Sequence, residues 1–393
     1  MAAKIVRQFN KITLLGAPTS AAAMSAGHEG APAALRSAGL IDRLRKIGYE
    51  VTDLGDDGAQ TYQPDDESPR ARNVKRVVAS IEALKPSVEQ AVKSAALPVI
   101  LTGDCSTVLA TVAGARRYFR NVNVIYVDRD ADLNIPATTP SGCVDGMVVS
   151  HLTGRGAPEL VRFWGEPQLV REPDVTLFGV ERLDAPEEKV LETSTLRRYL
   201  SKDVKRLGAK AAAQMALERI KTNKYEFVLH LDVDVISDFS ATNYPGSGGL
   251  TFDEVRDALL VFAQDPHMAA FDIAAYNPAK DPDGSAAKAI IALVSEVLQA
   301  RYETLKEAAA AAPPAAPKPD APKAQAAAAP APALAPVETE ASAGAPENFT
   351  FEPVPGESWS SDSVIDEGSG ETPAREAESV EDSSDTKPGE TQS

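Results

Sequence analysis

The chain has 393 residues, a formal net charge of −17 and only two cysteines, Cys105 and Cys143. This acidic balance excludes the basic face that nucleic-acid binding needs, and anionic membranes would repel it. No apolar run is long enough to span a bilayer, and no signal-peptide pattern follows Met1, so we expect a cytoplasmic protein without nucleic-acid or membrane partners. Two cysteines cannot build a disulfide framework.

Composition divides the chain into two parts. Apolar runs alternate with amphipathic stretches over residues 1–311, which predicts β-α units, a parallel sheet and one large α/β domain. Residues 312–393 are rich first in Ala and Pro and then in Ser, Glu, Gly, Asp and Thr, and they carry about −12 of the charge. Such a segment buries too little apolar surface to offset chain entropy, so we expect a disordered tail.

The elements of the folded part can be placed from their patterns in chain order. Thr251 with Glu254 three residues later predicts a capped helix start. We expect strands at 12–18, 49–55, 97–101, 122–127, 174–180, 227–234 and 268–274, and helices over about 31–45, 73–96 and 286–310.

The most informative stretch is DRDADLN at residues 128–134, which follows the β-branched run 122–127. Strand alternation places Asp128, Asp130 and Asp132 on one face and turns Arg129 away. Carboxylates gathered in this way repel each other unless a cation compensates them. A second apolar strand ends in Asp232 and Asp234, so the two clusters together predict one metal site built from oxygen ligands. A lone D-x-D would more often cap a turn, but two clusters disfavour that reading.

Five ordered motifs resemble those of the arginase (ureohydrolase) family over roughly the first 300 residues. They are TGDCS at 102–106, DRDADLN at 128–134, SGCVDGM at 141–147, DVD at 232–234 and AYNP at 275–278. The resemblance implies a three-layer α/β fold of the arginase/deacetylase type with a central parallel sheet. It also implies a trimer or hexamer, and a site at the carboxyl edge of the strands.

In the family, two histidines and four aspartates hold two Mn²⁺ ions. The aspartates correspond to Asp128, Asp132, Asp232 and Asp234, whereas the histidines correspond to Cys105 and Asp130. A thiolate favours Zn²⁺, Fe²⁺, Co²⁺ or Ni²⁺ over Mn²⁺. Six anionic ligands would over-neutralise two ions, so we expect one ion, or none, or a protonated Cys105 or Asp130. Cys105 is alternatively a small buried hydrophobe.

The resemblance also implies roles in catalysis and substrate binding. Asp132 corresponds to the carboxylate that orients the attacking hydroxide, and Asp145 to the proton-shuttling histidine; the alternative for Asp145 is a solvated loop acid. The glutamate that pairs with the guanidinium corresponds to Ala275, which argues against ordinary arginine hydrolysis. Residues that receive an amino acid's carboxylate and amino groups correspond to Asn134, Ser141 and Asp184.

Two hypotheses remain open from the sequence. The first is a metal-dependent hydrolase of a C–N bond (guanidino, amidino or amide) in an amino-acid-like substrate. The second is a non-catalytic protein of the same fold that binds a ligand or regulates a partner. Asn134 and Ser141 are also common loop-capping residues. We interpret His230, on the strand face of Asp232, as a core histidine or a support for a ligand, not as a ligand itself.

Overall fold

The computed structural model describes residues 7–165, 168–221 and 226–311. The tail predicted for 312–393 lies outside these residues. In the described part, no helix has the length and apolar character needed to cross a membrane.

A sheet of eight parallel strands forms the centre of the described region, in the order β2-β1-β3-β8-β7-β4-β5-β6. Its inner strands consist largely of β-branched and other apolar residues that are buried on both faces, as a covered parallel sheet requires. The strands are β1 (Lys11–Ala17), β2 (Glu50–Asp56), β3 (Leu97–Thr102), β4 (Val122–Val127), β5 (Val175–Phe178), β6 (Arg197–Tyr199), β7 (Glu226–Asp232) and β8 (Met268–Ala274). The predicted α/β class with a parallel sheet is confirmed; the short β6 was missed.

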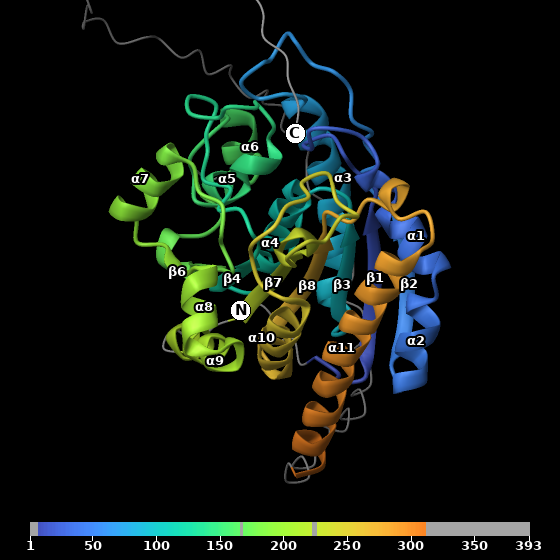
Figure 1. The fold of residues 1–393 in the computed structure, drawn as a ribbon. Helices are drawn as coiled ribbons and strands as arrows, with labels where there is room; N and C mark the ends of the chain where they lie inside the picture. The colour runs from blue at the N-terminus through green and yellow to red at the C-terminus, as the bar shows by residue number, and fades with distance from the viewer. Residues whose placement is uncertain (1–6, 166–167, 222–225, 312–393) are drawn as a thin grey trace, which may run out of the picture. The chain divides into compact units, whose positions relative to one another are not determined.

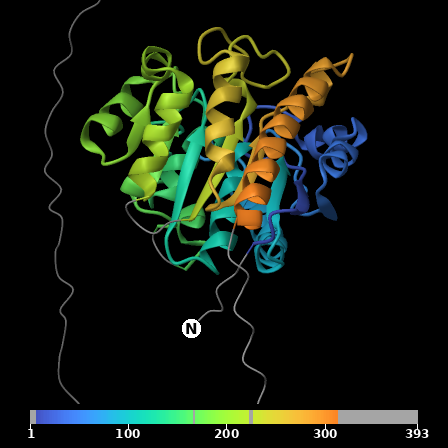
Figure 2. The ribbon, with the colours of Figure 1, turned by 90° about the horizontal axis from the view of Figure 1, so that it is seen from below.

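Helices cover both faces of the sheet, which gives three layers (Figures 1 and 2). On one face of the sheet, the helices α9, α10, α11 and α2 lie side by side in that order, and on the other face α3 packs against α4. The longer helices are α3 (Val74–Lys93), α4 (Val108–Arg116), α7 (Ala185–Thr193), α9 (Ala209–Lys221), α10 (Phe252–Gln264) and α11 (Ser285–Ala311). The shorter ones are α1 (Ala31–Ser37), α2 (Leu40–Ile47), α5 (Val148–Leu152), α6 (Pro158–Arg162) and α8 (Ser201–Leu207).

One helix prediction was wrong. The segment expected to form a single helix over about 31–45 is split into α1 and α2 at Gly39, whose φ of 96° is left-handed. Glycine adopts this conformation without a steric penalty, and the chain turns there. The capping box at the start of α10 is confirmed, because Thr251 accepts from the backbone of Glu254 and Glu254 reciprocates.

The order of the strands brings the sequence motifs together. β3, β8, β7 and β4 are consecutive neighbours, so their carboxyl ends meet at one edge. The turn after β3 is very tight, because a Cβ on Gly103 would lie 1.8 Å from the carbonyl oxygen of Thr19. Asp104 then accepts from the backbone of Ser106 and caps a short 3-10 turn that carries Cys105. Local chain geometry therefore fixes where the thiol points.

Candidate functional site

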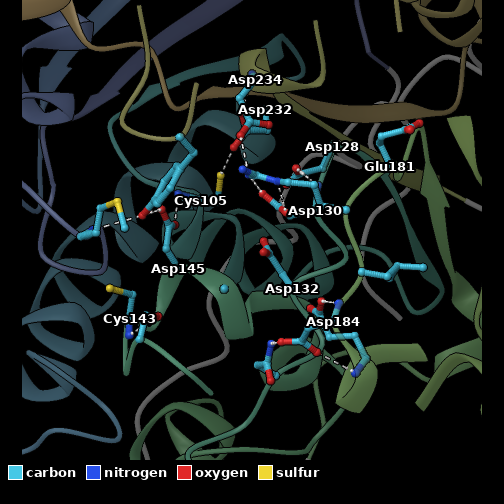
Figure 3. Close-up of a pocket in the computed structure, with 18 residues that line it drawn as sticks. Cys105, Asp128, Asp130, Asp132, Cys143, Asp145, Glu181, Asp184, Asp232 and Asp234 are labelled. Atoms are coloured by element: carbon cyan, nitrogen blue, oxygen red, sulfur yellow. Dashed lines mark hydrogen bonds and ion pairs between the residues drawn. The ribbon is translucent and has the colours of Figure 1, made fainter. Parts of the chain in front are cut away.

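A cavity of about 560 Å³ opens at this edge of the sheet. Figure 3 shows carboxylates and thiols from separate loops facing one another around it. All the candidate residues predicted from the sequence line it: Cys105, Asp128, Asp130, Asp132, Asn134, Ser141, Asp145, Asp184, Asp232 and Asp234. Residues that the sequence analysis did not select also line it, among them Glu181, Arg182, Glu187 and Tyr244.

Four groups form the floor of the cavity. The thiol of Cys105 donates to Oδ2 of Asp232 across 2.9 Å. One carboxylate oxygen from each of Asp128, Asp232 and Asp234 lies within 4.8 Å of the others. All four side chains are buried. Asp232 also accepts from the backbone of Asp234 at 2.7 Å, which fixes the D-x-D turn after β7.

The electrostatics of the floor favour either protons or a cation. Burial, and then repulsion between neighbouring carboxylates, raise the pKa values of Asp128 and Asp232 well above their usual range. Burial, and then the same acids, raise the pKa of the Cys105 thiol. Oδ1 of Asp234 is buried and has no hydrogen-bond partner among the described residues. A donor set of this kind, with an orphaned oxygen, fits a divalent cation.

Two arginines compensate part of this negative charge. Arg182 makes a two-pronged ion pair with Asp130, with Nε 2.8 Å from Oδ1, and reaches Oδ2 of Asp234 at 3.4 Å. Arg129 lies outside the cavity wall, so it does point away from the cavity, but its Nη2 also lies 3.4 Å from Oδ2 of Asp234. The sequence analysis did not anticipate either contact.

Asp132 leaves the geometry of the strand. Its φ is 49°, a left-handed conformation that aspartate tolerates, so strand alternation ends before this residue. Its Oδ2 accepts from the hydroxyl of Tyr126 at 2.6 Å, and burial, followed by repulsion from Asp130, raises its pKa well above the usual range. Asp132 still lines the cavity beside Asp128 and Asp130.

Asp145 is buried, which does not match a solvated loop acid. Its carboxylate accepts from the backbone N–H of Cys105 at 2.8 Å and from the hydroxyl of Tyr244 at 2.9 Å. Burial, followed by repulsion from Asp104, raises its pKa to about 8. This value lies where a carboxyl group can both give and accept a proton near neutral pH.

The rim carries the predicted substrate-binding residues. Nδ2 of Asn134 donates to Oδ2 of Asp184 at 2.8 Å, while Oδ1 of Asp184 caps α7 by accepting from the backbone of Glu187. Ser141 lies on a separate loop, where its hydroxyl accepts from the backbone N–H of Cys143 at 3.1 Å. Each of the three therefore has a local structural role as well as a place on the cavity wall.

His230 is the histidine nearest to the floor. It is fully buried, and one of its ring nitrogens lies within 4.8 Å of both Sγ of Cys105 and a carboxylate oxygen of Asp128. Its Nδ1 lies 3.1 Å from Oδ1 of Asp272, while its Nε2 has no hydrogen-bond partner in the described part of the chain. The D-x-D motif two residues later is the signal that could have identified it.

Ala275 contributes nothing to the chemistry of the cavity. It is fully buried at φ 67°, its backbone N–H donates to Gly103, and it is absent from the described residues that line the cavity. Among the residues that line the cavity, acids of the floor and rim, such as Glu181, have the charge that could pair with a guanidinium.

Comparison with known proteins agrees with this geometry. The sequence profile of the arginase family matches residues 10–299. An arginase from Bacillus caldovelox is 30% identical over 290 residues, which cover 73% of this chain and 97% of that protein. Its native crystal structure superposes with a TM-score of 0.68 over 74% of this chain and 98% of its own. An arginase from Bacillus subtilis is 28% identical over 73% of this chain and 97% of its own length. On this evidence the chain belongs to the arginase family.

Proposed function

We propose that the protein is a metal-dependent hydrolase of a C–N bond in an amino-acid-like substrate, and that ordinary arginine hydrolysis is not its reaction. The observation that carries this proposal is the buried floor formed by Cys105, Asp128, Asp232 and Asp234 beneath a substrate-sized cavity. Buried carboxylates are costly to keep without a compensating cation, so a fold that holds three of them and a thiol together supports a function for them.

The rim supports an amino-acid ligand. Asp184 offers a carboxylate to an ammonium group, and Asn134 and Ser141 offer an amide and a hydroxyl to a carboxylate. The other end of the cavity supports a neutral scissile group rather than a guanidinium. Ala275 has no charge, and Arg182 already holds the carboxylate of Asp130. A side-chain amide is uncharged and suits this end better than arginine does, whereas an amidine, which is cationic near neutral pH, would pair with an acid of the wall such as Glu181.

Among the floor residues, Cys105, Asp128 and Asp232 would hold the cation, with Asp234 beside them. When bound, a divalent cation supplies Lewis acidity to the scissile group and lowers the pKa of an attacking water. Manganese is the metal that the family resemblance implies, and the thiol of Cys105 shifts the preference toward Zn²⁺, Fe²⁺, Co²⁺ or Ni²⁺. Asp132, held by Tyr126, would orient the attacking water.

Asp145 is the best-placed proton carrier. Its raised pKa, its burial and its position on the cavity wall support its giving a proton to the departing nitrogen. The Tyr244 hydroxyl holds one carboxylate oxygen and the Cys105 backbone the other, so the group is oriented without losing contact with the cavity. This arrangement takes the place of the histidine that the family resemblance led us to expect.

One observation favours the second hypothesis, a non-catalytic binding protein that acts as a ligand-binding or regulatory partner. Arg129 and Arg182 already compensate Asp234 and Asp130 from within the chain, so the fold tolerates the acids without a full set of ions. A trimer or hexamer, as the family resemblance implies, would be compatible with mixed assembly in either case.

Release of ammonia by metal-loaded, chelator-free protein tests the proposal, because hydrolysis of a side-chain amide or amidine frees ammonia, whereas urea would come only from a guanidinium. We expect turnover of at least one amino acid with a side-chain amide or amidine, loss of turnover in Asp128→Asn, and normal turnover in Asp174→Asn. Asp174 is a matched control because it pairs with Arg171 on the surface. A protein that binds metal but releases no ammonia from any such compound would overturn the hydrolase and leave the binding protein.

A further inference from the structure

His230 lies in a row of three side chains that crosses three adjacent strands. Tyr126 on β4 is in register with His230 on β7, which is in register with Asp272 on β8. Side chains in register on parallel strands point to the same face, and the rings of Tyr126 and His230 stack at 4.4 Å with 15° between their planes. The imidazole is therefore clamped in one orientation.

The partner of this imidazole also fixes which nitrogen is free. Oδ1 of Asp272 accepts from Nδ1 of His230, and Oδ2 of Asp272 accepts from the hydroxyl of Thr111 on α4 at 2.8 Å. A neutral imidazole that donates through Nδ1 presents a lone pair on Nε2. Metal-binding histidines in proteins are held by such carboxylates in just this manner. Here Nε2 is buried and has no partner among the described residues.

The imidazole of His230 lies close to two groups of the floor. Strand alternation places Asp232 on the same face as His230, two residues along β7, and Asp128 on the same side as Tyr126. One imidazole nitrogen, the Cys105 sulfur and an Asp128 oxygen lie within 4.8 Å of one another, and that sulfur lies 2.9 Å from Asp232. Ligand atoms around one tetrahedral zinc are roughly 3–4 Å apart, so a small adjustment would close a four-ligand shell.

The opposite half of the floor is closed to a second ion. Arg182 engages both oxygens of Asp130 and also reaches Asp234, so one guanidinium lies where a second cation would need those two carboxylates. Arg129 approaches Asp234 as well, and its side chain is 1% exposed. Two guanidinium groups and a divalent ion would bring four positive charges to Asp130 and Asp234, which carry only two negative charges between them.

We propose that the floor binds a single divalent cation through Cys105, Asp128, His230 and Asp232, and that the guanidinium of Arg182 replaces a second cation. Asp272 is a positioning residue that acts through His230. A nitrogen and a sulfur ligand together select zinc, iron(II) or cobalt(II) over manganese. The inference rests on the proposed function only in requiring that a cation binds, because the ligand set can be read without turnover.

Metal content and cobalt spectra of the full-length protein test this ligand set. We expect about one equivalent of Co²⁺ per chain, a sulfur-to-cobalt charge-transfer band, and one exchangeable, paramagnetically shifted imidazole N–H signal. Cys105→Ala should abolish the band, whereas Cys143→Ala, a change of the second cavity cysteine, should keep it. His230→Gln should remove the shifted signal, whereas His28→Gln should retain it.

Two further measurements test whether Asp272 positions His230 and whether Arg182 excludes a second cation. Asp272→Asn should weaken Co²⁺ affinity about 10–100-fold while one equivalent still binds at high metal concentration, and Asp272→Glu should recover part of the loss. Arg182→Met should admit a second equivalent, and Arg171→Met, a surface control, should not. Circular dichroism of each metal-free variant checks that it is folded.

The metal content and spectra of the wild-type protein can overturn the proposal even if a variant does not fold. Two equivalents in the wild type, or no shifted imidazole signal from the folded cobalt protein, would overturn the single Cys105–His230 centre. Absence of turnover with one equivalent bound would count against the hydrolase alone. Turnover with two equivalents bound would uphold the hydrolase and refute this ligand set.

Discussion

Arg129 and Asp234 form an ion pair in which both side chains are only 1% exposed, with Nη2 3.4 Å from Oδ2. The same guanidinium donates to the carbonyl oxygens of Gly246, at 2.7 Å, and Tyr244. One side chain thus joins the strand end after β4 to the D-x-D turn after β7 and to the loop before α10. Removing one partner of such a buried ion pair strongly destabilises the folded state.

Arg129→Met should therefore destabilise the metal-free protein by about 3–5 kcal/mol, because it leaves Asp234 buried with less compensation. Chemical unfolding in the presence of a chelator measures the change. Arg129→Lys keeps the charge but loses the planar contacts, and we expect an intermediate loss. A Met variant as stable as the wild type would show that Arg129 does not compensate the floor.

Chelation should lower the thermal midpoint. A ligand that binds only the native state stabilises it by about 2.7 kcal/mol at one hundred times its dissociation constant. Differential scanning calorimetry with EDTA, and after addition of Zn²⁺ or Co²⁺, measures this effect. Asp232→Asn should reduce the difference between the two conditions, and an equal midpoint with and without chelator in the wild type would exclude a bound cation.

Asp184→Asn should separate the structural and binding roles of this rim residue. Asparagine is as good an N-cap as aspartate, so α7 should keep its capping bond to Glu187 and the thermal midpoint should change little. Loss of the carboxylate should nevertheless weaken binding of amino acids with a free ammonium group, by about tenfold or more. Isothermal titration of the variant against the wild type decides the point; equal affinities would remove Asp184 from the binding site.

His28 should make the protein sensitive to acid. It is buried, its Nε2 accepts from the backbone of Asn243 at 3.1 Å, and burial together with nearby Lys280 lowers its pKa to about 3. The folded state keeps it neutral, so its contribution is complete above pH 6.5, where the unfolded chain also binds no proton, and falls as the pH drops toward 3. At pH 5 the loss is about 2 kcal/mol relative to pH 7.5.

His28→Gln offers a control for this titration, because a glutamine oxygen can accept the same backbone bond but does not titrate. Between pH 7.5 and 5, the unfolding free energy of the wild type should fall by about 2 kcal/mol more than that of the variant. Parallel pH profiles would show that folding does not lower the pKa of His28.

The sequence predicts most of the strands and the start of α10, because β-branched runs and the Thr251–Glu254 capping box are local signals. It also identifies most of the acids of the cavity wall and the thiol of Cys105, because several of them follow strands, but it did not select Glu181 or Glu187. The break at Gly39 was missed because amphipathic spacing continues across it. Short β6 was missed because three residues hold too little pattern.

Contacts between distant segments were beyond the sequence. Arg182 and Asp130 are 52 residues apart, and Arg129 and Asp234 are 105 apart, so nothing local indicates that they pair. The role of His230 depends on strand order, which places β7 between β4 and β8 and so aligns it with Asp272. Side-chain alternation could assign the face of His230, but not its neighbours across the sheet.

Arg182 and Asp184 lie two residues apart on the short loop after β5, one at the floor and one at the rim. A change in the length of this loop would alter both the charge balance around the floor carboxylates and the position of Asp184, the carboxylate that we propose for the substrate's amine. Under the proposed function, the number of ions held and the choice of substrate would therefore be coupled through this one loop.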